Sequence, residues 1–271
     1  MRPWRIYADM GNSALHWAIS GPQGWLRAVR VVFDQNGVPH DTAVGIRVVL
    51  ERTECDPRQF AGAALVSSNP NMTDHAREAL AAVVGEVVVL GRDLTSDLTI
   101  DYDEPERIGQ DRIAAVEGAR LLRGAPVAVL SCGSCLTAQA LTAEGVMIAG
   151  GIAPGLGACA EGVAAAAPHL ADLARNAVDR GIEIVFERLD LPDPPRNTLD
   201  NLVWGVLAAY TGAAQYLAVG LLDQSGARDP VLLTGAGAHI IDQLAGGEWQ
   251  DEPLLVFEGL RAVHERWLGE T

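Results

Sequence analysis

Two short turns in the sequence carry residue types that could bind a nucleotide phosphate. The first, Asp9-Met10-Gly11-Asn12-Ser13, joins an apolar run over 4–8 to a second predicted strand over 14–20. A glycine lets the backbone approach a phosphate, and the carboxylate beside it can hold magnesium directly or through water. A single turn of this kind is usually only a turn. The near copy Ser131-Cys132-Gly133-Ser134 in the second half of the chain predicts two related lobes that close on a nucleotide.

A second candidate lies between these turns, where Gly109-Gln110-Asp111-Arg112 opens a helix predicted over 109–123. Asp111 falls in the first turn, where the positive end of the helix dipole favours an ionised carboxylate. A carboxylate in a cleft between lobes could act as a general base toward a hydroxyl nucleophile. Arg112 could hold a substrate carboxylate in a forked pair. The local alternative is an ordinary helix start with a surface arginine.

The charge of the chain narrows the partners that we expect. The formal net charge is −15, and all 20 basic residues are arginine. An acidic chain without a basic cluster argues against nucleic acid and against an anionic membrane as partners. An anionic substrate must then be held by backbone amides, helix N-termini, single arginines or a metal. The absence of lysine also excludes a P-loop mechanism.

The four cysteines, with no signal sequence at the start of the chain, favour a reducing cytoplasm. Cys132 and Cys135 form a C-x-x-C pattern at the second turn. Neither a second such pair nor a nearby histidine pair completes a zinc site. We interpret the two cysteines as incidental small residues in a tight turn, with a redox or metal role as the alternative.

A stretch without charge from 201 to 222 is long enough to cross a bilayer. It contains polar residues and lacks basic flanks, and Asn197-Thr198 with Asp200 supplies an N-cap signature at its start. Apolar residues recur at steps of three and four, and glycines between them permit close helix approach. We expect a long helix that is buried on most of its surface in a subunit interface rather than in a membrane.

The order of predicted elements indicates a duplicated α/β architecture. Three strands (4–9, 14–20 and 26–32) precede alternating helices and strands, and a second set of three strands (126–130, 136–142 and 145–149) follows the helix over 109–123. We expect loops over 91–108 and over 167–195. A last unit follows the long helix, with strand 230–234, helix 236–245, strand 253–257 and helix 258–268. This order predicts an N-terminal lobe over 1–115 and a C-terminal lobe over 116–271.

Further motifs occur in order along nearly the whole chain. They are Ser67-Ser68 followed by Pro70, Tyr102 to Pro105, Gly150-Gly151-Ile152-x-Pro154-Gly155, Asn197-Thr198, Thr234-Gly235-x-Gly237, Pro253-Leu254-Leu255 and Gly259-Leu260. Together with the two turns and Gly109-x-Asp111-Arg112, they resemble type III pantothenate kinase of the actin-like and sugar-kinase superfamily. The specific part is Gly-x-Asp-Arg in register with Tyr102, because the glycine turns are common to the superfamily.

The resemblance implies a duplicated actin-like (ribonuclease H-like) ATPase fold with the nucleotide site in the cleft between two lobes. It also implies ATP-dependent phosphorylation of pantothenate to 4'-phosphopantothenate, the first step toward coenzyme A. Asp111 would be the general base, and pantothenate would be held by Tyr102, Gly109, Gln110 and Arg112, with Thr198 from the partner subunit of a homodimer. ATP would be bound by Asp9, Met10, Gly11, Asn12, Ser13, His16, Gly133 and Ser134, with magnesium near Asp9.

Four positions depart from the family pattern. Ser131 replaces an aspartate associated with a monovalent cation, K⁺ or NH₄⁺, and Gln139 replaces a second acid. His16 replaces a lysine, and Thr234-Gly235-Ala236 replaces Thr-Gly-Gly. We therefore expect a kinase with little or no activation by potassium. The alternative is a catalytically degenerate relative that binds a nucleotide or a partner without turnover. An actin-like or sugar kinase of other specificity lacks support from the Gly-x-Asp-Arg context.

Overall fold

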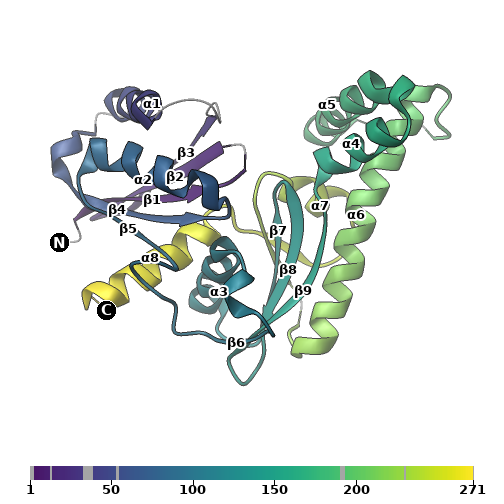
Figure 1. Cartoon of the computed structure of the whole chain (residues 1–271). Coiled ribbons are helices and arrows are strands. Elements are labelled where there is room, and N and C mark those ends of the chain that lie inside the picture. Colours follow the sequence, from purple (N-terminus) through teal and green to yellow (C-terminus); the bar gives the residue numbers. More distant parts are fainter. Residues whose placement is uncertain are drawn as a thin grey trace. The chain divides into compact units, whose positions relative to one another are not determined.

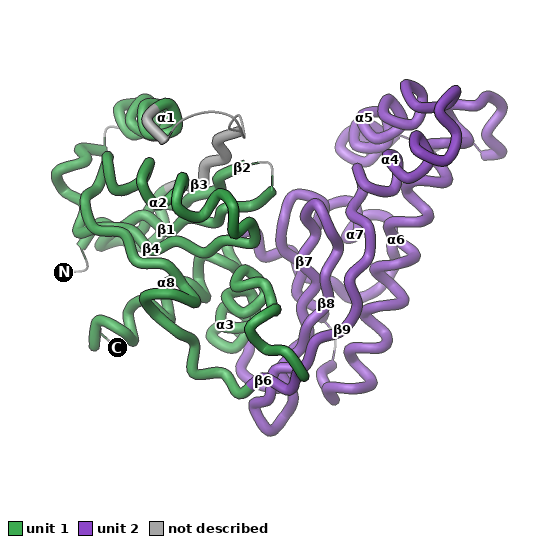
Figure 2. The backbone as a smooth tube through the Cα atoms, viewed as in Figure 1, with its two compact units in different colours: residues 1–99, 103–122, 254–271 green, residues 100–102, 123–253 purple. Residues whose placement is uncertain are grey.

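The computed structural model describes residues 3–12, 14–32, 39–52, 55–189, 193–228 and 230–270. The chain forms two compact units (Figure 2): unit 1 comprises residues 1–99, 103–122 and 254–271, and unit 2 comprises residues 100–102 and 123–253. This division differs from the lobes expected from the sequence, 1–115 and 116–271. The helix at the expected seam belongs to unit 1, and the last helix returns to unit 1 because it packs against the first sheet.

Unit 1 is built on a five-stranded sheet. Its strand order is β3-β2-β1-β4-β5. The first three strands are antiparallel neighbours, and β4 and β5 run parallel to β1. The strands are β1 (Trp4–Met10), β2 (Ala14–Gly21), β3 (Gly24–Val32), β4 (Phe60–Ser67) and β5 (Val87–Val89).

Unit 2 repeats this arrangement. The order β9-β8-β7-β10-β11 has the same parallel and antiparallel relations as unit 1, and β6 is added beside β9. The strands are β6 (Thr99–Asp101), β7 (Val127–Cys132), β8 (Cys135–Leu141), β9 (Val146–Pro154), β10 (Val231–Thr234) and β11 (Trp249–Asp251). The predicted duplication is therefore confirmed, strand by strand.

Helices cover both faces of the first sheet, because its strands alternate side chains between two apolar layers. Ile6 and Ala8 pack toward α1 (Pro39–Arg52) and α2 (Pro70–Val84). Tyr7, on the other face, belongs to the cluster formed with α3 (Gln110–Arg123) and α8 (Leu255–Leu268). Short 3₁₀ helices, η1 (Pro57–Gln59) and η2 (Pro105–Arg107), lie in the connections. Thus β6 and η2 fall in the segment 91–108 that was expected to be loop.

Helices α3 and α8 cross at two glycines. A Cβ on Gly118 would collide with the carbonyl oxygen of Leu255, and a Cβ on Gly259 would collide with that of Ala114. The absence of both side chains lets the two backbones touch. This crossing sets the position of α3, and therefore of the residues at its N-terminal end.

In unit 2, α6 (Thr198–Ser225) packs one face on the second sheet and on α4 (Leu156–Ala166) and α5 (Ala171–Glu187) (Figure 1). Helix α7 (Ala238–Leu244) and the 3₁₀ helix η3 (Pro168–Leu170) complete this unit. Helix α5 was expected to be irregular. Its buried face consists mainly of alanine, glycine and two aliphatic residues, and the sequence prediction followed the aspartates and prolines of the segment up to Pro195 instead. Gly181 packs against Leu207 of α6 there.

The last strand was also misplaced by the sequence prediction. The apolar run over 253–257 begins α8, and the strand lies earlier, at β11. The run looks like a strand because five residues include three large aliphatic side chains and a phenylalanine. In the structure Leu255, Leu260 and Val263 share a buried helical face instead.

Helix α6 is the one helix among the described residues that is long and apolar enough to cross a membrane. Only 33% of its most apolar window is buried within the chain. The expected burial of its remaining surface in a subunit interface stays a prediction. Its outer face exposes Tyr216 (81%) and Val219 (68%), together with part of Trp204.

Candidate functional site

The first turn is fixed by the backbone around it. The N–H of Gly11 donates to the carbonyl of Ala14 at 3.0 Å, which closes the β1–β2 hairpin. The carbonyl of Met10 accepts from the N–H of Ser68 at 3.1 Å and from the Ser67 hydroxyl at 3.4 Å. The end of β4 therefore holds the turn from the neighbouring strand.

Asp9 is the most perturbed carboxyl group in unit 1. Its backbone pairs with that of His16 across the hairpin, and its Oδ1 atom is buried without a hydrogen-bond partner. Burial raises the pKa of Asp9 to about 8, and the negative charge of Asp111 adds to this shift. Asn12 is exposed beside it, whereas Ser13 lies outside the described residues.

Asp111 lies near enough to Asp9 for its charge to raise the pKa of Asp9. It lies in the first turn of α3, and a Cβ on Gly109 would collide with its Oδ1 atom. Burial raises the pKa of Asp111, while the backbone N–H and the positive charge of Arg112 oppose the shift. Desolvation therefore opposes the helix end, which was expected to keep this carboxylate ionised.

The neighbours of Asp111 are held by packing. Arg112 is a buried arginine, 6% exposed, and the isoleucines at 108 and 113 on either side are buried as well. Gln110 lies against Gly91, whose φ of +84° and lack of a side chain leave room for the amide group. Gly109, Gln110, Asp111 and Arg112 therefore form one rigid group at the start of α3.

The second turn is also closed by a glycine N–H, over a shorter span than the first. The N–H of Gly133 donates to the carbonyl of Cys135 at 3.0 Å, and the N–H of Gly155 donates to that of Ser134 at 3.1 Å. A Cβ on Gly155 would collide with the backbone oxygens of Gly133 and Ser134. Gly133 and Ser134 themselves are exposed. The sequence motif ending in Gly155 therefore supports the turn, a role that the spacing alone did not indicate.

A neutral polar cluster lies at the base of this turn. Gln139 is fully buried, and its Nε2 atom donates to the Ser131 hydroxyl at 2.9 Å. The Oγ1 atom of Thr137, which is paired with Ser131 across the hairpin, is buried without a hydrogen-bond partner. The sequence identified Ser131 and Gln139 as departures from a pattern but did not indicate that they bind each other or that Thr137 joins them.

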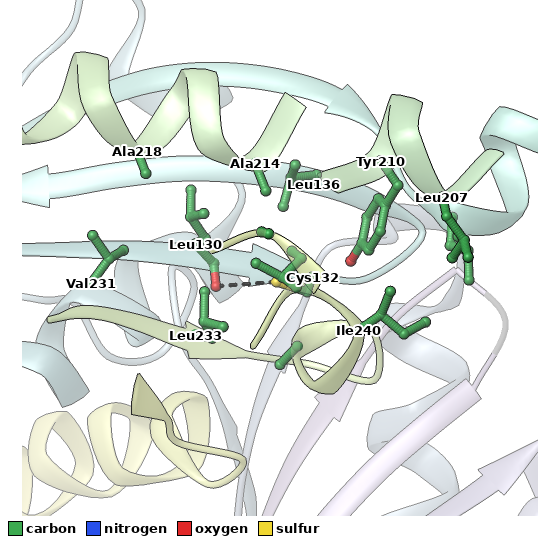
Figure 3. Close-up of a cluster of buried hydrophobic side chains, with 14 of the residues drawn as sticks. Leu130, Cys132, Leu136, Leu207, Tyr210, Ala214, Ala218, Val231, Leu233 and Ile240 are labelled. Carbon is green, nitrogen blue, oxygen red and sulfur yellow. Dashed lines mark hydrogen bonds between the residues drawn. The ribbon is translucent and has the colours of Figure 1, made fainter. Parts of the chain in front are cut away.

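The C-x-x-C cysteines differ in environment. The Cys132 thiol lies in the core beneath α6, near Leu136 and Tyr210, and its Sγ atom contacts the Leu130 carbonyl at 3.6 Å (Figure 3). Burial raises the pKa of Cys132 to about 12, which makes it a poor nucleophile. Cys135 is exposed. Within the described ranges, no three histidine, cysteine or acidic side chains gather into a metal site. The geometry favours the incidental interpretation.

Two predicted substrate residues belong to unit 2. Tyr102 directly follows β6 and is 44% exposed. Thr198 is the exposed first residue of α6, behind the N-cap Asn197, whose side chain accepts from the Asp200 N–H at 2.9 Å. Both side chains are accessible to a ligand.

A sequence model of the type III pantothenate kinase family matches residues 5–219. The type III pantothenate kinase of Thiobacillus denitrificans is 29% identical, with 96% of each chain covered. That of Roseiflexus sp. (strain RS-1) is 26% identical, with 95% of this chain and 96% of the relative covered. Among solved structures, the activator of the 2-hydroxyisocaproyl-CoA dehydratase from Clostridium difficile, with bound ADPNP, has a TM-score of 0.56 at 10% identity. It covers 98% of this chain and 97% of that chain, and this likeness supports the actin-like fold.

Proposed function

Since the chain belongs to the type III pantothenate kinase family, we propose that it transfers the terminal phosphoryl group of ATP to the hydroxyl of pantothenate. The product is 4'-phosphopantothenate, the first intermediate toward coenzyme A. The observation that carries this proposal is the partly buried pair of Asp9 and Asp111, at the end of β1 and the start of α3, in which the charge of Asp111 raises the pKa of Asp9.

Asp111 is the general base in this proposal. A base is most effective when its pKa lies near the operating pH, and burial moves the pKa of Asp111 in that direction. The carboxylate accepts the proton of the substrate hydroxyl as the oxygen attacks phosphorus. A Cβ on Gly109 would collide with the carboxylate oxygen, so glycine at this position lets the carboxylate lie where it does.

Asp9 is the proposed magnesium residue. A buried carboxylate oxygen without a hydrogen-bond partner fits a hard cation, directly or through a bound water. Magnesium at this place would neutralise charge on the transferring phosphoryl group. It would also offset the repulsion that the charge of Asp111 exerts on the Asp9 carboxylate.

Further residues are proposed to position the two substrates. Arg112 pairs with the pantothenate carboxylate, and Gly109, Gln110, Tyr102 and Thr198 contact the rest of that molecule. The residues proposed to hold ATP are Asp9, Met10, Gly11, Asn12, Ser13, His16, Gly133 and Ser134. Phosphoryl transfer depends mainly on positioning and charge, so these contacts are expected to supply most of the rate enhancement.

We further propose a cytoplasmic homodimer formed through the outer face of α6. Tyr216 and Val219 are exposed apolar residues on this face. Around Gly205 and Gly212 a Cβ would meet nothing within 4 Å, which leaves room for a second helix. Thr198 at the end of the same helix then belongs to the active site of the partner. An acidic chain of this kind is not expected to bind nucleic acid or membrane.

The neutral cluster of Ser131 and Gln139 favours one rival function. A relative that has lost acidic groups at its second turn could bind a nucleotide without turnover. A coupled assay with ATP, magnesium and pantothenate, in sodium, potassium and ammonium salts, separates the two. Turnover in any salt supports the kinase, and a flat trace from folded, ATP-binding protein favours the rival.

A further inference from the structure

The internal repeat makes Ser131 the counterpart of Asp9. Asp9 is the last residue but one of β1, where its backbone pairs with His16 of β2 and with Val66 of β4. Ser131 occupies the same position in β7, where it pairs with Thr137 of β8 and Thr234 of β10. Equivalent places at the two hairpin turns therefore carry a carboxylate in unit 1 and a hydroxyl in unit 2.

The hydroxyl of Ser131 has a defined donor. Gln139 lies two residues beyond Thr137 on the same face of β8, and its amide nitrogen donates to the Ser131 oxygen at 2.9 Å. A serine hydroxyl has one proton and two lone pairs. Because the amide occupies a lone pair, the proton of Ser131 remains available to a further acceptor.

The surroundings of Ser131 favour an anionic acceptor. Its neighbours Thr137, Gln139 and Thr234 carry no charge, and the buried hydroxyl oxygen of Thr137 has no hydrogen-bond partner. A buried polar atom without a partner marks a place where a ligand or water completes the hydrogen bonding. A cation would need oxygen lone pairs that are free, and the Gln139 amide already occupies one of those on Ser131.

We infer that Ser131 donates a hydrogen bond to a phosphate oxygen of the bound nucleotide, and that Gln139 is the positioning residue that aims this hydroxyl. The inference rests on the proposed function, which assigns ATP to the second turn. Unit 2 then contributes a neutral donor where unit 1 contributes an acid.

The first test measures ATP binding by calorimetry, with magnesium and without pantothenate. Ser131→Ala should weaken ATP binding about tenfold, since a hydrogen bond to a charged group is lost. Gln139→Glu should weaken it at least as much, because a carboxylate would accept the Ser131 proton and repel phosphate. Gln243→Glu adds the same charge at an exposed glutamine of unit 2 and should bind ATP normally. Unchanged binding by Ser131→Ala overturns the inference.

The second test separates positioning from general support of the fold. If Gln139 acts through Ser131, then Gln139→Leu should weaken ATP binding in the parent chain and have no further effect in the Ser131→Ala background. Additive losses in the double variant contradict the positioning role. Ser131→Ala alone keeps the inference testable if a Gln139 variant fails to fold.

These measurements remain informative if pantothenate is not the substrate. ATP binding that depends on Ser131, without phosphorylation of pantothenate, refutes the proposed activity and leaves the inference standing. If the chain phosphorylates pantothenate and Ser131→Ala leaves its ATP affinity unchanged, the proposed activity stands and the inference is refuted.

Discussion

Replacing Asp9 by asparagine should stabilise the unliganded protein near neutral pH, although it removes the proposed magnesium contact. The Asp9 carboxyl is buried, its Oδ1 atom has no partner, and Asp111 adds a second negative charge nearby. An amide of the same shape carries no charge to desolvate or repel. In the parent chain, binding of magnesium is expected to compensate for the desolvation and repulsion of the Asp9 carboxylate.

The size of the effect follows from the pKa of Asp9. This pKa is about 8 in the folded chain, against an ordinary value of 3.8. The folded state therefore holds the proton more tightly than the unfolded state, and the free energy of unfolding decreases as pH rises from about 4 to about 8. Each pH unit in this window lowers the free energy of unfolding by about 1.4 kcal/mol. Between about pH 5.5 and pH 7.5, the free energy of unfolding of the parent chain should fall by about 3 kcal/mol, whereas that of Asp9→Asn should not show this fall.

Urea unfolding with EDTA at these two pH values measures the difference. The stability gain of Asp9→Asn over the parent should be larger at the higher pH by about 3 kcal/mol. Asp172→Asn, at a side chain that is 99% exposed, serves as the matched control and should show no such pH dependence. Added magnesium should stabilise the parent more than Asp9→Asn. A gain that is the same at both pH values would refute the assignment of the raised pKa to Asp9.

Four further predictions follow from the site and the packing. Asp111→Asn should slow the chemical step by about 10²–10⁴-fold with little change in pantothenate binding; near-normal turnover in a steady-state assay would mean that the carboxylate only caps its helix. Turnover by the parent chain should depend little on potassium, and Ser131→Asp should introduce dependence; strong activation of the parent by potassium over sodium would contradict this. Val219→Asp should convert a dimer to a monomer in sedimentation velocity; an unchanged sedimentation coefficient would exclude the α6 face as the interface. Gly118→Ala should lower the melting temperature, because its Cβ would collide with backbone. Gly157→Ala, with open space around its Cβ, is the control and should leave the melting temperature unchanged or raise it. Equal melting temperatures of the two variants would contradict the close helix crossing.

The sequence predicted those parts of the fold whose patterns are local. The turn at Gly11 and the strands on either side follow from alternation and glycine chemistry, and the structure has them within a few residues. Helix α5 was missed because its buried positions are small and Gly181 lowers its helix propensity. Its stability comes from packing on α6, a contact that is distant in sequence. The run that begins α8 was taken for a strand for a different reason, because its large aliphatic and aromatic side chains are common in strands.

Within the site, the sequence identified residue types better than their environments. Asp9 and Asp111 were identified from motifs, and their mutual electrostatic effect appears only when β1 and α3 pack in one unit. The direction of the Asp111 pKa shift depended on burial, which no local pattern reports. Likewise, the hydrogen bond from Gln139 to Ser131 joins two strands whose register had to be known first.

The crossing of α3 and α8 at Gly118 and Gly259 has a consequence for the order in which the molecule is made. Apart from residues 100–102, unit 2 is a continuous stretch from 123 to 253, so all of it is synthesised before α8. During that interval α3, with Asp111 at its start, lacks the backbone against which it packs. The segment that bears the proposed base must therefore wait, with an apolar face uncovered, until residues 254–271 emerge.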